Sequence, residues 1–140
     1  MKKILVLFVL AVSLFSAEIK WEKTICDAVK RAQKEHKPIM FVVSRHSCKY
    51  CVMLENTTFK DKKFVDKINK NFIAVIAFSD DGDYIPGNLY SNGTPASWFL
   101  YKNGFSMYDG PATGAIPTKD FLKILDEVQK RYKELEKKGL

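Results

Sequence analysis

The chain lacks a second Cys-x-x-Cys motif, an internal repeat, a low-complexity segment and an interdomain linker. With only three cysteines in 140 residues, it cannot supply the four ligands of a structural zinc site built on paired motifs. No apolar run reaches the about 20 residues that a transmembrane helix needs. A basic patch interleaved with exposed aromatics is also missing, so nucleic acid is not an expected partner. These absences leave a single domain, which we expect to be monomeric.

The N-terminus does carry a shorter apolar run. A basic start precedes apolar residues 4–12 and the small pair Ser16-Ala17, an order typical of a secretory signal peptide. We expect residues 1–17 to be a signal peptide cleaved after Ala17, with cleavage after Ser16 or an uncleaved membrane anchor as alternatives. Residues 18–140 would then be the mature domain, located in the periplasm.

The rest of the chain alternates between helical and strand patterns. Unbroken apolar runs are typical of strands covered on both faces, and apolar positions three and four residues apart indicate helices. Strands separated by helices should be parallel, and a hairpin adds an antiparallel edge. We therefore expect an α/β fold, a central mixed β-sheet flanked by helices on both faces. The predicted helices cover residues 24–36, 48 onward, 61–70 and 117 onward, and the predicted strands cover 39–43, 72–78, 95–101 and 105–108.

Three details of this pattern are specific enough to test. Asn103-Gly104 predicts a type I′ hairpin turn. On the helix that opens at Cys48, we expect Val52 and Met53 to point inward, with Leu54 as a further candidate. Cys26 falls beside the apolar face of the first helix, where we expect a buried, inert thiol, with a regulatory or intermolecular disulfide as the alternative.

The sequence Cys48-Lys49-Tyr50-Cys51 directly follows the first apolar strand. At a helix N-terminus, backbone N–H groups favour the thiolate, which is the form that attacks disulfides. One helical turn separates the two sulfurs, so Cys51 can attack a mixed disulfide formed on Cys48. A static disulfide across one turn would constrain almost nothing, and His46 with both cysteines offers only three metal ligands. We interpret the pair as redox-active, with no metal and no cofactor.

This motif, together with Gly93-Thr94-Pro95 ahead of a strand, an Asn-Gly turn and a closing helix, resembles the thioredoxin superfamily over roughly residues 20–135. The residues that follow the cysteines are most similar to exported thioredoxin-like reductases, such as the C-terminal periplasmic domain of DsbD. The resemblance implies a thioredoxin-like fold, Cys48 as nucleophile and Cys51 as resolving thiol. It also implies disulfides or thiols of exported proteins as partners, and a membrane protein as a possible source of electrons.

Further site residues rest on the same resemblance. Thr94-Pro95 matches the superfamily's cis-proline, although only about 5–6% of X-Pro bonds are cis, and would present Thr94 to an extended substrate strand; a trans proline at a strand start is the alternative. Glu55 matches a glutamate near the buried thiol and is expected to accept the Cys51 proton, or to be an ordinary surface carboxylate. Val42 stands where many thioredoxins carry a buried acid.

Charge and exposure around the cysteines give the remaining expectations. Lys49 should favour the Cys48 thiolate, and His46 should add positive charge below about pH 6.5, unless it is a plain surface residue. Tyr50 is expected to contact substrate. Residue 47 is serine where thioredoxins commonly have tryptophan. This difference keeps open a non-enzymatic module that binds extended peptides or chaperones a partner. The direction of electron flow is not fixed by the residues; we favour reduction on the resemblance alone.

Overall fold

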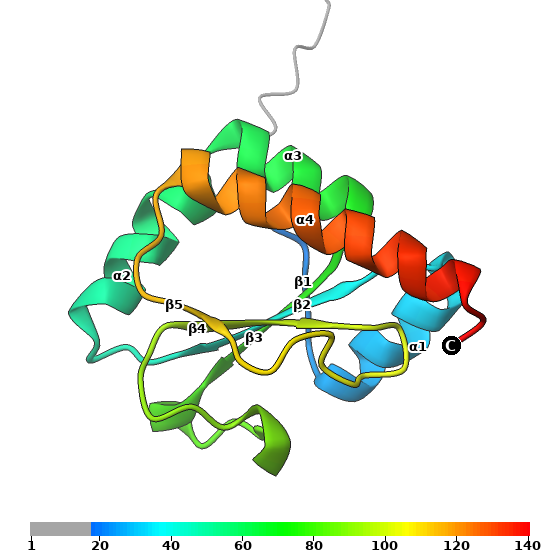
Figure 1. Cartoon of the computed structure of the whole chain (residues 1–140). Helices are drawn as coiled ribbons and strands as arrows, with labels where there is room; N and C mark the ends of the chain where they lie inside the picture. Colours follow the sequence, from blue (N-terminus) through cyan, green and yellow to red (C-terminus); the bar gives the residue numbers. More distant parts are fainter. Residues whose placement is uncertain (1–17) are drawn as a thin grey trace, which may run out of the picture.

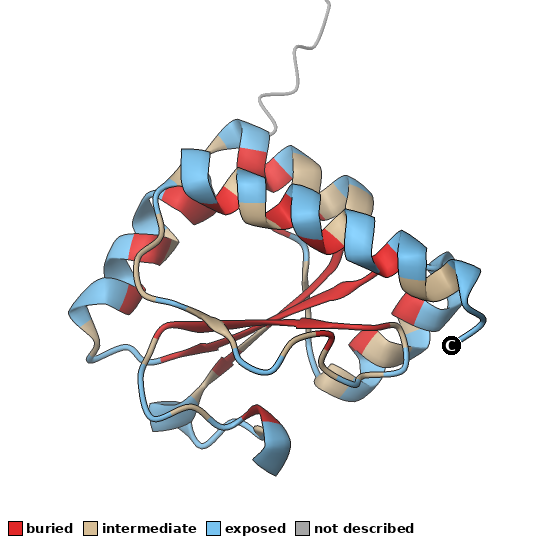
Figure 2. Cartoon of the chain, viewed as in Figure 1, coloured by how far each residue is buried: buried red, intermediate tan, exposed pale blue. Residues whose placement is uncertain are grey.

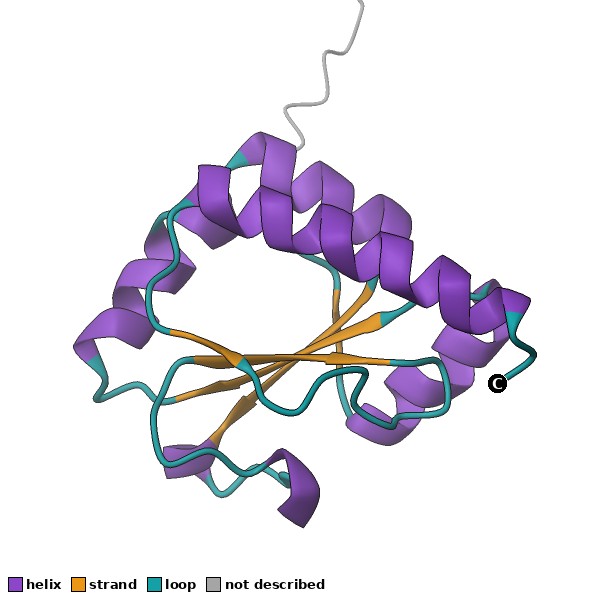
Figure 3. Cartoon of the chain, in the orientation of Figure 1, coloured by secondary structure: helices purple, strands orange, loops and turns teal. Residues whose placement is uncertain are grey.

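The computed structural model describes residues 18–140, so the predicted signal peptide lies outside the described residues. Within that range, every helix is too short or too polar to traverse a lipid bilayer. Figure 3 shows helices and strands alternating along the chain. The elements are β1 (Trp21–Glu22), α1 (Ile25–Glu35), β2 (Ile39–Ser44), α2 (Lys49–Asn56), η1 (Thr58–Lys60), α3 (Lys62–Asn71), β3 (Ile73–Phe78), η2 (Ser79–Asp81), η3 (Gly87–Leu89), β4 (Ala96–Leu100), β5 (Ala112–Thr113) and α4 (Thr118–Lys137).

The five strands form one mixed sheet in the order β1-β3-β2-β4-β5. β3 pairs in parallel with both β1 and β2, whereas β4 runs antiparallel to β2 and to β5. Every residue of β2 and β4 is buried, and Figure 2 shows these strands as the buried centre of the molecule. This burial explains why their sequences are almost entirely apolar, with Ser44 and Ser97 as buried polar exceptions.

Successive side chains of β2 enter two separate cores, as the strand period of two requires. Met40 and Val42 belong to one core, whose other members come largely from α2, α3 and α4. Phe41 and Val43 belong to the other, together with Ala28 and Ala32 of α1. Figure 1 shows α3 and α4 side by side over one face of the sheet and α1 over the other. The predicted sheet with helices on both faces is therefore confirmed.

The four helices occur where the apolar spacing predicted them. On α4, the residues Phe121, Leu125, Val128 and Tyr132 are buried, and they recur at spacings of four and three. Phe121 meets Phe64 of α3 with ring centroids 4.9 Å apart. This aromatic contact joins the two helices above the sheet.

The chain reverses at Asn103-Gly104 as predicted, but the turn is not of type I′. Among the described residues His36 is the only non-glycine with positive φ, so Asn103 cannot occupy a type I′ turn. Instead the Tyr101 N–H donates to the Phe105 carbonyl at 2.8 Å around a three-residue loop, in which Gly104 has φ 89°. The returning segment makes only an isolated bridge, Leu100 to Ser106.

A local hydrogen bond explains why no strand forms at residues 105–108. The Ser106 hydroxyl lies 2.7 Å from the Tyr108 carbonyl oxygen and 3.3 Å from its N–H, and such side-chain bonds compete with a strand ladder. The antiparallel edge forms later, where β5 pairs with β4.

Candidate functional site

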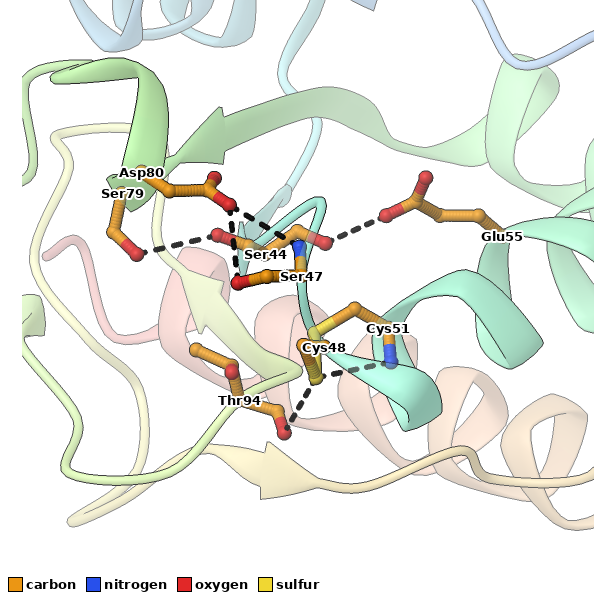
Figure 4. The surroundings of a disulfide bond; sticks show 8 residues. All are labelled: Ser44, Ser47, Cys48, Cys51, Glu55, Ser79, Asp80 and Thr94. Carbon is orange, nitrogen blue, oxygen red and sulfur yellow. Dashed lines mark hydrogen bonds between the residues drawn. A yellow bond between two sulfur atoms is a disulfide. The ribbon is translucent and has the colours of Figure 1, made fainter.

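The two cysteines lie where β2 ends and α2 begins. Cys48 is the N-cap of α2, with extended backbone angles of φ −101° and ψ 117°. Cys48 and Cys51 form a disulfide with their Cα atoms 5.2 Å apart, drawn in Figure 4. Cys48 is partly exposed, whereas Cys51 is completely buried. Only the first sulfur is therefore accessible to another protein.

Two backbone groups contact the sulfur of Cys48 and act on it in opposite ways. The Cys51 N–H donates to this sulfur at 3.2 Å, which stabilises a thiolate. The carbonyl oxygen of Thr94 lies 3.4 Å from the same sulfur, where it can accept from a thiol but repels a thiolate. The N–H of Cys51 and the start of a helix that is eight residues long both favour ionisation.

Thr94 reaches the cysteines because of the strand order. β4 lies antiparallel to β2, with Ala96 opposite Val43, so the residues just before β4 lie beside the loop that follows β2. The Thr94–Pro95 bond is cis in the structure, the isomer that the resemblance predicts. Figure 4 shows the Thr94 carbonyl pointing at Cys48. The structure thus brings together Cys48, Cys51 and Thr94 from two distant parts of the sequence.

Glu55 lies on the same side of α2 as Cys51. The buried residues of this helix and the turn after it are Cys51, Leu54, Thr58 and Phe59. Glu55 is half-buried next to them. Its carboxylate accepts a hydrogen bond from the Ser44 hydroxyl at 2.6 Å, visible in Figure 4. The carboxylate is therefore fixed to the end of β2, beneath the helix that carries both cysteines.

Sequence reasoning missed Ser44, which is only 1% exposed. A signal was available, because Ser44 ends an apolar strand at the same side-chain period as Met40 and Val42. A polar residue on that covered face needs a hydrogen-bond partner, and Glu55 is that partner.

Glu55 also lines a cavity of about 350 Å³ with Glu18 and Lys60.

His46 lies against the loop after β3. Its Nε2 is 2.7 Å from a carboxylate oxygen of Asp81, and its ring stacks on Phe78 with centroids 4.1 Å apart. The hydrogen bond to Asp81 raises the pKa of His46 above its usual value. Although His46 is more readily protonated as a result, the Asp81 carboxylate compensates its positive charge. His46 is an exposed side chain, held by this pair rather than by contact with the cysteines.

The loop before Cys48 is tied to η2 at further points that sequence reasoning missed. The Ser47 N–H donates to Asp80 at 3.2 Å, and the Ser79 hydroxyl donates to the Ser44 carbonyl at 3.4 Å. Burial opposes the ionised Asp80, yet hydrogen bonds from the backbone, that of Ser47 foremost, hold its pKa below the usual range. Potential ligand atoms of His46, Asp80 and Asp81 lie within 4.8 Å of one another, all on exposed residues.

The outer side of α2 is exposed next to the motif. Lys49 is exposed and Tyr50 is 57% exposed. The prediction that Val52 and Met53 point inward is wrong, because each is 42% exposed, whereas Leu54 is buried. The buried side of α2 starts at Cys51, so the next two positions turn away from the sheet.

Cys26 is exposed, so the prediction of a buried thiol is wrong. The buried residues of α1 are Ala28 and Ala32. Cys26 lies two residues before Ala28, and residues at that spacing do not share a helix face.

Comparisons with known proteins give a consistent fold. A family model described as a thioredoxin-like domain matches residues 25–129. Spermatogenesis-associated protein 20 of Rattus norvegicus and that of Mus musculus are 31% and 33% identical to this chain over 58 residues. That segment is 41% of this chain but only 7% of each relative.

Solved structures with similar folds include a thioredoxin from Thermus thermophilus, at 23% identity and TM-score 0.66, covering 79% of this chain and 87% of that one. DsbH oxidoreductase aligns at 14% identity and TM-score 0.63, covering 82% and 87%. The oxidised C-terminal domain of DsbD from Neisseria meningitidis aligns at 16% identity and TM-score 0.52, covering 73% and 90%. At these identities the similarity establishes the fold.

Proposed function

Because the chain belongs to the thioredoxin-like domain family and is a thiol–disulfide oxidoreductase, we propose that it is exported and reduces disulfides of other exported proteins. The observation that supports disulfide exchange is the asymmetry of the Cys48–Cys51 disulfide, whereas export and the reducing direction rest on the sequence. Cys48 is partly exposed and lies beside the Thr94 carbonyl, while Cys51 is buried directly behind it. A static cross-link would not need that asymmetry.

The reaction begins with both cysteines reduced. The Cys48 thiolate attacks one sulfur of a substrate disulfide, forms a mixed disulfide and expels the other substrate sulfur as a thiolate. Cys51 then loses its proton and attacks the Cys48 sulfur, which restores the intramolecular disulfide and releases the second substrate thiolate. The substrate gains two electrons and the chain loses two.

The second step needs an acceptor for the Cys51 proton, because Cys51 is buried. Glu55 is the carboxylate on the same side of α2, and Ser44 holds it in place through a 2.6 Å hydrogen bond. The cavity of about 350 Å³ that Glu55 lines would let the proton pass to solvent. Val42 lies where thioredoxins often carry an acid, so Glu55 performs this step here.

Substrate binding would use the surface around Cys48. The Thr94 backbone is positioned to pair with an extended segment of substrate. The exposed side chains of Tyr50, Val52 and Met53 would cover the apolar side chains of that segment. The oxidised pair is returned to the dithiol by a partner dithiol that gives up two electrons, which we propose to be a membrane protein.

Reduction of insulin by dithiothreitol in the presence of the protein tests the activity. We expect wild type to accelerate the reaction, Cys48→Ser to abolish the acceleration, and Cys51→Ser to accumulate mixed disulfides that non-reducing gels detect. Cys26→Ser is the matched control and should behave as wild type. A wild type without turnover would favour a peptide-binding module, and a Cys51 that alkylates faster than Cys48 would reverse their roles.

Export is tested separately, on the full-length chain. Expression in a bacterium with two membranes, followed by fractionation and mass spectrometry, should give a periplasmic protein that begins at Glu18. Retention of residues 1–17 in the cytoplasmic fraction would contradict export and leave the redox activity untouched.

A further inference from the structure

The short turn η2 follows β3 and contacts the loop before Cys48 through three consecutive residues. Ser79 donates to the Ser44 carbonyl, Asp80 accepts from the Ser47 N–H, and Asp81 pairs with His46. The Asp80 carboxylate also lies 3.5 Å from the Ser47 hydroxyl. Figure 4 shows Asp80 and Ser79 on one side of this loop, with Cys48 immediately after it. The position of the nucleophile therefore depends on η2.

The side chains at this contact carry a net negative charge. His46 pairs with Asp81 and also lies within 4.8 Å of the Asp80 carboxylate. One imidazole faces two carboxylates, so the contact keeps a net negative charge, and Asp80 accepts from the backbone N–H of the residue directly before Cys48. No ion pair is assigned to Asp80 within residues 18–140. Arg45 and Lys49, the cations that flank the loop, are exposed, as is Asp80, so solvent screens all three charges. Asp80 differs from the two cations because its carboxylate is held by the Ser47 N–H, directly before Cys48.

A negative charge at this position acts on one redox state only. The disulfide is uncharged, whereas the reduced pair carries the Cys48 thiolate, so repulsion destabilises the reduced form. A couple whose reduced form is destabilised is a stronger reductant, since a stabilised reduced form makes a strong oxidant.

We propose that Asp80 is a positioning residue that holds the loop before Cys48 and, by its charge, keeps the Cys48/Cys51 couple reducing. This inference deepens the proposed function and rests on the use of the pair in disulfide exchange. It assigns to η2, which the sequence presents as part of an ordinary polar loop, a share in setting how strongly the Cys48/Cys51 couple reduces its partners.

The test is the equilibrium constant of the couple with glutathione at pH 8, measured by alkylation and mass spectrometry. Asp80→Asn keeps an oxygen that accepts from the Ser47 N–H but removes the charge. We expect it to stabilise the dithiol about threefold, equivalent to about 15 mV toward a more oxidising couple. Titration of the Cys48 thiolate by absorbance at 240 nm should show its pKa lowered in the same variant.

Two controls separate charge from geometry. Asp80→Glu retains the charge and should leave the equilibrium constant close to that of wild type. Asp66→Asn removes an equal charge from α3, whose carboxylate pairs with Lys62, and should leave it unchanged. A shift in Asp80→Ala without one in Asp80→Asn would overturn the charge effect, and no shift in either would overturn the proposal.

Insulin reduction by wild type is measured alongside, so that the two proposals can fail separately. Absence of turnover with a shifted equilibrium constant in Asp80→Asn would remove the proposed function and retain the role of Asp80. Turnover by wild type with an unshifted equilibrium constant in Asp80→Asn would retain the proposed function and remove the role of Asp80.

Discussion

Cys48 has a donor and an acceptor within 3.4 Å of its sulfur, the Cys51 N–H and the Thr94 carbonyl. The two contacts serve different states of the reaction. The N–H supports the thiolate that attacks, and the carbonyl is the group to which an incoming peptide can bond. The balance between them sets the fraction of thiolate at neutral pH, and nearby side chains adjust that balance.

The first prediction concerns Lys49, the exposed residue directly after Cys48. We expect Cys48 to ionise well below the free-cysteine pKa of about 8.5, and Lys49→Glu to raise its pKa because a cation is replaced by an anion. The thiolate fraction at pH 7 should fall about threefold, as ultraviolet absorbance against pH can measure. A wild-type Cys48 that titrates near 8.5 and does not respond to Lys49→Glu would contradict this.

The second prediction concerns the proton of Cys51. Glu55→Gln should slow resolution of the mixed disulfide about a hundredfold, at the lower end of the range typical of a lost general base, while attack by Cys48 stays unchanged. Ser44→Ala should have a smaller effect in the same direction, because it frees the carboxylate without removing it. Rapid-quench alkylation distinguishes the two steps. Equal slowing of both steps in Glu55→Gln would indicate a structural role instead.

The cysteine pair of the candidate site was recognisable from the sequence, but the side chains that contact the segments around it were not. Cys48, Cys51 and Pro95 belong to short motifs, which can be recognised without knowing which other segments of the chain lie nearby. The contacts of Ser44 and Asp80 span 11 and 33 positions of the chain. Such contacts depend on strand order, which the local pattern of apolar residues does not specify.

At the scale of elements, α3 shows how a single side chain sets where a helix begins. The Asp61 carboxylate accepts from the N–H groups of Lys63 and Phe64 at 2.9 and 3.2 Å. These donors would otherwise lack partners at the start of the helix. Phe64, which is fully buried, is thereby held against α4.

The third prediction follows from this cap. Asp61→Ala should lower the free energy of unfolding by about 1 kcal/mol, measured by urea denaturation with an unchanged m-value. Asp66→Ala removes a carboxylate from the same helix that only pairs with exposed Lys62, and should cost less than about 0.5 kcal/mol. Equal losses in the two variants would mean that charge, not capping, explains the effect of Asp61.

Elements were predicted well where burial alone decides them. The runs that became β2 and β3 are covered on both faces, so hydrophobicity identified them without any knowledge of their neighbours. The strand predicted at residues 105–108 does not form, because the Ser106 hydroxyl donates to the nearby Tyr108 carbonyl. The prediction that Val52 and Met53 are buried was wrong. The buried face of α2 contains Cys51 and Leu54, and Val52 and Met53 lie on the opposite face although they are apolar.

At the scale of the whole molecule, the end of α4 is attached to the opposite side of the fold from the cysteines. Glu136 pairs with Lys102 at 2.5 Å and with His36 at 3.4 Å, and the Tyr101 hydroxyl donates to the same carboxylate. The hydrogen bonds from Lys102 and Tyr101 hold the pKa of Glu136 below its usual value. Three segments of the chain thus meet at one carboxylate.

The fourth prediction is the pH dependence of this contact. A carboxyl group whose pKa is lower in the folded state stabilises the fold above its unfolded pKa of about 4.3, and the stabilisation is lost as pH falls through the folded pKa. Glu136→Gln should therefore reduce stability by about 0.5–1 kcal/mol at pH 7. The difference from wild type should close between about pH 5 and pH 2, as measured by thermal unfolding. A difference that persists undiminished at the acid end would contradict the ionic origin.

The exposure of Cys26 has a practical consequence. The chain has three cysteines, and in the oxidised protein the other two are bonded to each other, so Cys26 is the sole free thiol. A maleimide fluorophore would attach there alone, on α1 and away from the contact surface of α2. Subsequent reduction would restore the working dithiol in a labelled molecule. Fluorescence anisotropy of such a conjugate could then follow its association with candidate substrates and electron donors in real time, without any further substitution.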